Sequence, residues 1–293
     1  MALAALSGDE QRIIFSRLCN VLDPGFAVAF SSANSEMWTL TQAEREQLQA
    51  DYEAAAALGL KAAGALGRTG RSCKELREAK MVQFIHNGLS SDDLALLGTL
   101  GSVLPALETL HLNERAAAGP DGVRRLAEKL GAGALPALAV LNLSDTYVGD
   151  AGASALAAAL GRGALPRLKV LNLSSTSIGD AGLVALAPAL RRLPALDALG
   201  LVSNPLGDEG LADLVAPPPP AGAPPPTTTG VLTELKGLYL SHTQIGDAGC
   251  ATLASALDSG VLPALKFLEL NGAPASPAAL AAVGEALGRQ AKG

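Results

Sequence analysis

Few residues in this sequence are of the types that carry out metal or proton-transfer chemistry. The 293-residue chain contains three histidines, which are widely separated: His86, His111 and His242. Cys19, Cys73 and Cys250 are equally far apart, and the Cys-x-x-Cys pair that is typical of zinc sites is missing. Because catalysis needs such groups to converge, we expect no enzyme activity, no metal site and no cofactor. The cysteine usage favours a reducing location, intracellular and cytoplasmic.

The overall charge and hydropathy argue against two further classes of partner. Lys and Arg number 22 against 28 Asp and Glu, and the sequence shows no basic cluster of the kind that binds phosphates. The most apolar long run, "AAAALGLKAAGAL" from Ala54, is short and interrupted by Lys61, so it cannot span a bilayer. We therefore expect neither a nucleic-acid partner nor a membrane span.

The chain repeats itself with a period of about thirty residues, which is typical of solenoid proteins. The motif Leu-Pro-x-Leu, or Leu-Thr-Glu-Leu in one copy, begins at Leu104, Leu135, Leu165, Leu193, Leu232 and Leu262. A weaker copy begins at Leu76, with Ala79, Val82, Phe84, Asn87 and Leu89 on the same template. The sequence thus predicts about seven units, over 76–293.

Each unit combines two hydrophobic periods. Leu141 and Leu143 alternate with polar residues, which predicts a short strand, and Leu156 and Leu160 follow at helical spacing. Four aspartates stand just before the helical stretches, where they could cap the helix that follows them: Asp150, Asp180, Asp208 and Asp247. A single unit of this size cannot bury its own leucines, so the units must stack.

This pattern resembles leucine-rich repeat proteins of the ribonuclease-inhibitor-like class. The resemblance implies an α/β fold, a horseshoe-shaped solenoid with a concave parallel sheet and convex helices, here preceded by a small helical module over 1–75. The family's usual asparagine after the strand is retained at Asn87 and Asn204, while Thr146, Thr176 and Thr243 replace it elsewhere. A threonine hydroxyl can still bond the turn backbone.

The strand residues between the leucines should point to the concave face, where a protein partner would bind. The candidate partner-binding residues are Gln83, His111, Asn142, Asn172, Tyr239, Phe267 and Glu269. The middle of this face is small and polar, and its aromatic residues, Tyr239 and Phe267, gather at the C-terminal end. Because aromatic anchors dominate many interfaces, we expect the strongest contacts there.

The first 75 residues show apolar stripes instead of the repeat. Ile13, Ile14, Leu18 and Leu22 predict one helix face; a second stripe comprises Val28, Phe30 and Trp38. This stretch loosely resembles an F-box, which would dock onto the adaptor of a cullin ubiquitin ligase. The adaptor-binding residues under that resemblance would be Ile13, Ile14, Phe15, Leu18, Leu22, Pro24 and Trp38. The alternative is that the module only caps the first repeat.

The longest step between units contains the proline-rich insertion "APPPPAGAPPPTTTG" at 216–230. Prolines at this density favour an extended surface loop, and the alternative is a ligand for an SH3-like or WW-like groove. Taken together, the sequence predicts a non-enzymatic protein-interaction scaffold. Two alternatives remain open, an F-box-type substrate receptor of a cullin ubiquitin ligase and a GTPase-activating protein of the Ran type, which shares this repeat class.

Overall fold

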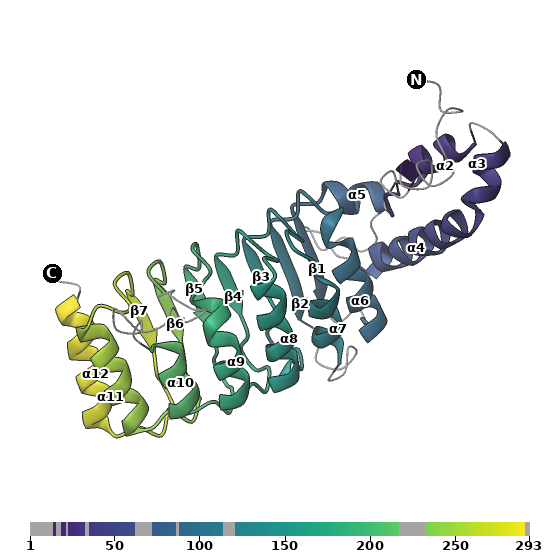
Figure 1. Cartoon of the computed structure of the whole chain (residues 1–293). Coiled ribbons are helices and arrows are strands. Elements are labelled where there is room, and N and C mark those ends of the chain that lie inside the picture. The colour runs from purple at the N-terminus through teal and green to yellow at the C-terminus, as the bar shows by residue number, and fades with distance from the viewer. Residues whose placement is uncertain are drawn as a thin grey trace.

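The protein is described from a computed structural model of the 293-residue chain (Figure 1). The described residues are 14–15, 19–21, 23–32, 35–61, 72–85, 88–113, 121–216 and 232–290. Several residues of the sequence predictions therefore lie outside them: Ile13, Leu18, Leu22, His86 and Asn87. Residues 217–230 of the proline-rich insertion also lie outside the described residues.

A single parallel sheet of seven strands runs the length of the repeat region, in the order in which the strands occur in the chain. The strands are β1 (Met81–Ile85), β2 (Thr109–Asn113), β3 (Val140–Asn142), β4 (Val170–Asn172), β5 (Ala198–Gly200), β6 (Gly237–Tyr239) and β7 (Phe267–Glu269). Because each strand pairs only with its sequence neighbours, the units stack in one row. The predicted α/β leucine-rich repeat solenoid is confirmed.

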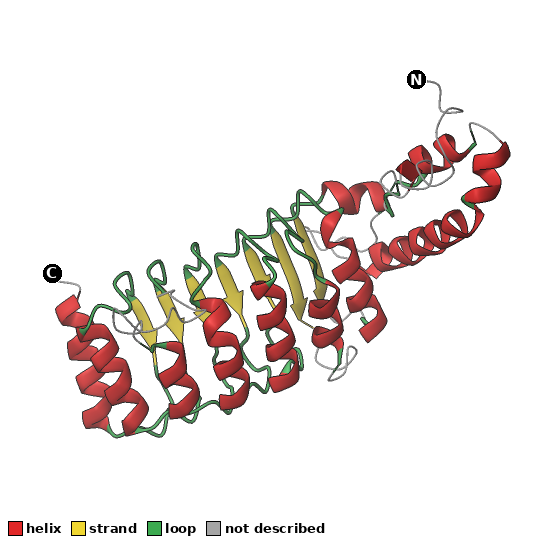
Figure 2. Cartoon of the chain, in the orientation of Figure 1, coloured by secondary structure: helices red, strands yellow, loops and turns green. Residues whose placement is uncertain are grey.

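A helix follows each strand and returns the chain to the start of the next one. The helices are α6 (Ser91–Thr99), α7 (Gly122–Lys129), α8 (Gly149–Gly161), α9 (Asp180–Leu190), α10 (Asp208–Leu214), α11 (Asp247–Asp258) and α12 (Pro277–Gln290), and the short 3-10 helix η2 (Leu100–Ser102) extends α6. Figure 2 shows these helices side by side along one face of the sheet. The opposite sheet face, which the helices do not cover, is called the open face below.

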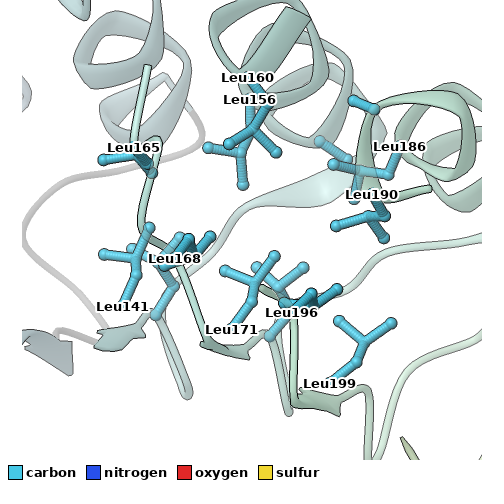
Figure 3. Close-up of a cluster of buried hydrophobic side chains, with 14 of the residues drawn as sticks. Leu141, Leu156, Leu160, Leu165, Leu168, Leu171, Leu186, Leu190, Leu196 and Leu199 are labelled. Carbon is cyan, nitrogen blue, oxygen red and sulfur yellow. The ribbon is translucent and has the colours of Figure 1, made fainter. Parts of the chain in front are cut away.

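The core lies between the sheet and the helices and consists mostly of leucines. In β4, for example, Leu171 is fully buried while Val170 and Asn172 on either side are partly exposed. Figure 3 shows leucines of three neighbouring units meeting in this layer. The weak first unit follows the same rule, since Leu76, Val82, Phe84 and Leu89 are all buried. The apolar positions of that unit's predicted template are confirmed, whereas Asn87 lies outside the described residues.

The helices before β1 are joined to the solenoid at their C-terminal end. They are α2 (Gly25–Ser31), α3 (Ser35–Leu40), α4 (Gln42–Lys61) and α5 (Cys73–Glu78). Ala55 and Leu58 of α4 belong to the same hydrophobic cluster as the repeat leucines. The Lys61 ammonium lies 2.7 Å from the carboxylate of Asp93, which also caps α6 with Ser90. The solenoid core therefore continues without a break into α4.

The pKa of Asp93 reflects this junction. Burial would raise the pKa of its carboxyl, but hydrogen bonds from Lys61 and from the backbone and hydroxyl of Ser90 outweigh burial and lower it. Asp93 is thus ionised at neutral pH, and the charge both pairs with Lys61 and accepts the amide bonds of the capping box.

A second, smaller cluster holds the outer part of this N-terminal region. It consists of Phe15, Ala27 and Leu48, with Cys19, Val21 and Phe30 packed against it. The predicted stripe of Val28, Phe30 and Trp38 is wrong as a buried face, because Val28 and Trp38 are both exposed. α2 turns only Ala27 and Ser31 fully inward, so Phe26 and Val28 face water while Phe30 is partly buried against the cluster.

The four aspartates before the helices do not cap their own helices, which corrects the prediction. The N-cap positions of α8 to α11 show no side-chain cap bond. Instead, the Asp150 carboxylate accepts hydrogen bonds from the backbone of Gly179 (2.8 Å) and Gly182 (3.1 Å) in the next unit. The other three repeat the arrangement: Asp180 with Gly207 (2.7 Å) and Gly210 (2.9 Å), Asp208 with Gly246 (2.7 Å), and Asp247 with Ser276 (2.6 Å). Each aspartate therefore fastens one helix to the start of the next.

This arrangement explains the glycine that ends three of the four Gly-Asp-x-Gly motifs, at Gly182, Gly210 and Gly249. A Cβ atom on Gly182 would lie 2.5 Å from Oδ1 of Asp150 and 2.9 Å from a methyl carbon of Ile178. The last unit has Ala279 at the equivalent position and uses a different cap, because the Ser276 hydroxyl accepts from the amide of Ala279 (3.2 Å). That local cap, with Pro277 in the first turn of α12, distinguishes the last unit from those before it.

Replacing Gly182 by alanine should lower the free energy of unfolding by about 1 to 3 kcal/mol, because the new methyl group displaces the Asp150 carboxylate from its two amide donors. Chemical denaturation of the full chain would measure the change. The matched control is Gly284→Ala in α12, where a Cβ atom meets nothing within 4 Å. That variant should be more stable by about 0.4 to 1 kcal/mol. Equal effects of the two substitutions would contradict the explanation.

The polar residue after each strand closes the turn. The hydroxyl groups of Thr176 and Thr243 donate to the carbonyls of Leu173 (2.6 Å) and Leu240 (2.7 Å), and that of Thr146 donates to Leu112 in the preceding unit. All three threonines are buried. The prediction that threonine can replace the family's asparagine in this turn is confirmed.

Asn204 makes the most hydrogen bonds of these residues. Its Oδ1 accepts from the amides of Thr176 (3.2 Å) and Ile178 (2.9 Å) in the preceding unit. Its Nδ2 donates to the carbonyls of Leu173 (2.7 Å) and Leu201 (3.0 Å). The side chain is almost completely buried, so it links two units inside the core.

Candidate protein-binding face

The strand register brings the predicted central residues into one row across the open face. The paired positions, from β1 to β7, are Gln83, His111, Asn142, Asn172, Gly200, Tyr239 and Glu269. This set is called the central row below. A neighbouring row, two residues earlier in each strand, ends with Gly237 and Phe267. All seven predicted partner-binding residues thus lie on the same face, in two adjacent rows.

The polar middle of the central row is hydrogen-bonded within itself. Oδ1 of Asn142 accepts from the amide of Ser144 (2.9 Å), and Oδ1 of Asn172 accepts from the amide of Ser174 (3.0 Å). Nδ2 of Asn142 lies 3.2 Å from Nδ1 of His111. Burial lowers the pKa of His111, so its ring is neutral at pH 7 and Nδ1 can accept this bond. These side chains are held in place before any partner arrives.

Gly200 leaves room for one of these asparagines. A Cβ atom on Gly200 would lie 2.7 Å from Oδ1 of Asn172 and 3.2 Å from the hydroxyl of Ser174. The side chain of Asn172 therefore leans toward the neighbouring strand, over the glycine. The middle of the face is flat and polar as a result, and it has no projecting anchor.

The C-terminal end of the face is different. The ring of Tyr239 folds back over Gly237 of its own strand, where a Cβ atom would lie 3.1 Å from Cε2 and 3.2 Å from the hydroxyl. Gly237 pairs in register with Phe267, and neighbouring parallel strands lie about 4.8 Å apart. The tyrosine ring therefore covers the residue that pairs with Phe267, and Phe267 itself is 63% exposed. Glu269, which is also exposed, pairs in register with Tyr239. The two aromatic residues Tyr239 and Phe267, together with the neighbouring Glu269, are called the aromatic cluster below.

Charged residues line the edge of this face at which the strands begin, one position before the first strand residue. Lys80 pairs with Glu108 (3.0 Å) and Lys236 with Asp197 (2.8 Å), each across neighbouring units. A hydrogen bond to Asp197 raises the pKa of Lys236. Opposite charges neutralise each other within these two pairs, while Lys169 and Lys266 add positive charge at the equivalent positions before β4 and β7.

Sequence reasoning missed residues at the end of a strand and in the turn that follows one. Nδ2 of Asn113 donates to the hydroxyl of Ser144 (2.6 Å), which extends the polar network upward by one row. Tyr147 is half-exposed in the turn after β3, where its ring covers Gly149. The alternation in β2 could have indicated Asn113, which continues the pattern of His111. Nothing in the turn sequence indicates where the ring of Tyr147 points.

The four described residues among those predicted to bind an adaptor do not form one exposed surface. Phe15 is fully buried in the N-terminal cluster with Ala27 and Leu48, so it packs the region's own core and offers no surface to a partner. Ile14 and Pro24 are half-buried, and Trp38 is 44% exposed. Ile13, Leu18 and Leu22 lie outside the described residues.

A search for other chemistry in the described part of the chain gives no site. Nowhere in those residues do three His, Cys, Asp or Glu side chains gather in a way that could hold a metal ion. Within the same ranges, none of the helices combines the length and the hydropathy that crossing a bilayer requires. Cys19, Cys73 and Cys250 are free, and burial is the main cause that raises the pKa of each thiol.

Comparison with known proteins identifies the repeats. The family model described as "Leucine Rich repeat" matches residues 136–157, 165–187 and 232–254. These ranges contain β3 with the start of α8, β4 with most of α9, and β6 with the start of α11. No curated protein matches the chain.

Several solved structures are similar in fold. Actin-binding site 2 of leiomodin-1 is 16% identical over 58% of this chain and 86% of its own, with a TM-score of 0.41. The tropomodulin C-terminal domain from Caenorhabditis elegans is 17% identical over 70% and 95%, with a TM-score of 0.40. Internalin C2 from Listeria monocytogenes is 20% identical over 78% and 88%, with a TM-score of 0.41. The three matched units and the single parallel sheet of seven strands give the repeat region a leucine-rich repeat fold.

Proposed function

We propose that this chain is a non-enzymatic interaction scaffold of the ribonuclease-inhibitor-like class that binds a protein partner on its open face. The observation that supports this most is the aromatic cluster. Phe267, on the strand next to that of Tyr239, exposes most of its side chain to water on a face that is otherwise small, polar and internally bonded. Aromatic side chains in such a setting supply much of the energy of protein interfaces.

The polar middle of the face supports the same proposal. Since Asn142 and Asn172 are already fixed by the amides of Ser144 and Ser174, little side-chain entropy would be lost when a partner covers them. They would define orientation, and Tyr239 and Phe267 would provide most of the affinity. The predicted partner-binding residues Gln83, His111 and Glu269 would lie at the edges of the contact.

We further infer that the region before residue 76 caps the solenoid through α4. Ala55 and Leu58 bury the end of the repeat core, and the ion pair of Lys61 with Asp93 fixes the orientation of the helix. Capping of this kind keeps a solenoid end from exposing apolar surface. The F-box-type and GTPase-regulating alternatives have no specific observation in their favour, so we do not propose them.

The experiment compares the full chain with the double variant Tyr239→Ala/Phe267→Ala in affinity purification from native cells, with quantitative mass spectrometry. We expect the variant to recover its specific partner at least about tenfold less well, because each aromatic anchor contributes about 2 kcal/mol or more. The control is Leu60→Ala, which removes an exposed apolar side chain from α4, away from the open face. The proposal fails if the double variant recovers the same proteins as the control and the unmodified chain.

A further inference from the structure

A second exposed apolar surface lies at the opposite end of the molecule from the aromatic cluster. Among the described residues, four of the seven large hydrophobic side chains with high exposure lie on α2 and α3: Phe26, Val28, Trp38 and Leu40. Phe26 is 74% exposed. Figure 1 shows α2, α3 and α4 extending away from the first repeat, so the repeats do not cover this surface. A concentration of this kind is typical of an interaction site.

A groove runs between α2 and α4 next to these residues. Its volume is about 410 Å³, and it is lined by Val28 of α2 and by Arg45, Glu46, Gln49, Ala50 and Glu53 of α4. Val28 and Ala50 provide its apolar part. The guanidinium carbon of Arg45 lies 3.3 Å from the centre of the Trp38 ring, and Nη2 donates to the Trp38 carbonyl (2.6 Å). Trp38 is thereby held at the end of the groove.

The groove is acidic. The Glu46 carboxylate accepts a hydrogen bond from the side-chain amide of Gln42 (3.0 Å), and that of Glu53 accepts one from the side-chain amide of Gln49 (2.8 Å). Neither carboxylate forms an ion pair with any described residue. Arg45 is the one cation in the lining, and it is committed to the ring and carbonyl of Trp38. The lining thus presents two uncompensated carboxylates, which a cationic partner would neutralise.

We propose that this groove binds an amphipathic helix of a protein partner that carries an apolar ridge flanked by Lys or Arg. A helix fits better than an extended peptide, because both walls are helices and provide no strand edge for backbone pairing. Glu46 and Glu53 are two turns apart on one face of α4, which is about 10.5 Å along the axis. Two basic residues that are seven positions apart on the bound helix would meet both carboxylates. Apolar residues three and four positions after the first of these basic residues would face Val28, Ala50 and Trp38.

The test uses three synthetic peptides about 18 residues long, or five helical turns. The first is amphipathic, with leucine on one face and lysine beside it; the second has glutamate in place of lysine; the third has the composition of the first in scrambled order. Trp38 is the sole tryptophan of the chain, so its emission reports on this groove directly. Titration of the full chain should give a blue shift and saturable binding with the first peptide, and at least tenfold weaker binding with the other two.

Two double variants separate a specific groove from general attraction to an acidic protein. Glu46→Gln/Glu53→Gln removes both groove carboxylates and should weaken binding of the lysine peptide at least fivefold. The matched control, Glu209→Gln/Glu234→Gln, removes two exposed carboxylates in the solenoid, changes the net charge equally and should alter binding less than twofold. Tight binding of the scrambled peptide, equal effects of the two variants, or no binding of the lysine helix would each overturn the proposal. None of these outcomes depends on whether the open face binds a partner.

Discussion

Replacing Leu171 by alanine should lower the free energy of unfolding by about 3 to 5 kcal/mol. Leu171 is fully buried in the middle of β4, and leucines of its own and both adjacent units surround it (Figure 3). A cavity at this position cannot close easily, because the strand is held in register on both sides by β3 and β5. The cost therefore includes both the lost transfer free energy of the side chain and the unfilled space.

Denaturant unfolding of the full chain would measure this loss. The control is Leu60→Ala, which removes the same atoms from α4 at a position that is 68% exposed. Its effect should stay within about 0.5 kcal/mol. If Leu171→Ala cost less than about 1.5 kcal/mol, the leucine layer would be loosely packed, contrary to the structure.

The substitution Asn204→Ala should have an effect of similar size, about 3 to 5 kcal/mol, because it breaks a buried network instead of an apolar contact. Without the side chain, the amides of Thr176 and Ile178 and the carbonyl of Leu173 lose their bonds to it inside the core. Each buried group left unsatisfied costs about 1 to 3 kcal/mol.

Two comparisons isolate the hydrogen bonds from the volume. Asn204→Leu restores the lost volume but no hydrogen-bonding group, so it should be as destabilising as the alanine variant. Asn142→Ala removes the same side chain from the open face, where water can replace its bonds to Ser144 and His111, and should cost about 1 kcal/mol or less. A stable Asn204→Leu variant would show that the asparagine only fills space.

Much of the fold follows from the sequence because burial is periodic. Leu141, Leu171 and Leu199 occupy the same position in consecutive units, and stacking is the one way to remove all of them from water. The central row follows from the same alternation, since residues on either side of a buried strand leucine must face the other way. The roles of Thr176 and Thr243 were predictable for a local reason, because their hydroxyls bond carbonyls three residues away; the bond of Thr146 to Leu112 in the preceding unit was not.

The parts that the sequence did not predict depend on contacts through space. Asp150 lies at the start of one helix, but its carboxylate accepts hydrogen bonds from the start of the next helix. Its position in the sequence does not show which of these two helices it caps. Trp38 lies on an apolar stripe yet is exposed, because α3 is short and the small cluster of Phe15, Ala27 and Leu48 leaves no place for it. At the open face, the position of Tyr239 was predictable, but the fold of its ring over Gly237 was not.

The aspartate bonds between helices give the repeat array a direction. The starts of α9, α10, α11 and α12 are each capped by a carboxylate that belongs to the preceding unit. Detaching the last unit leaves the caps of all remaining helices in place, whereas detaching a unit from the other side strips the cap from its successor. Local unfolding of the repeat array should therefore require less free energy when it begins at the C-terminal unit than when it begins at the N-terminal side.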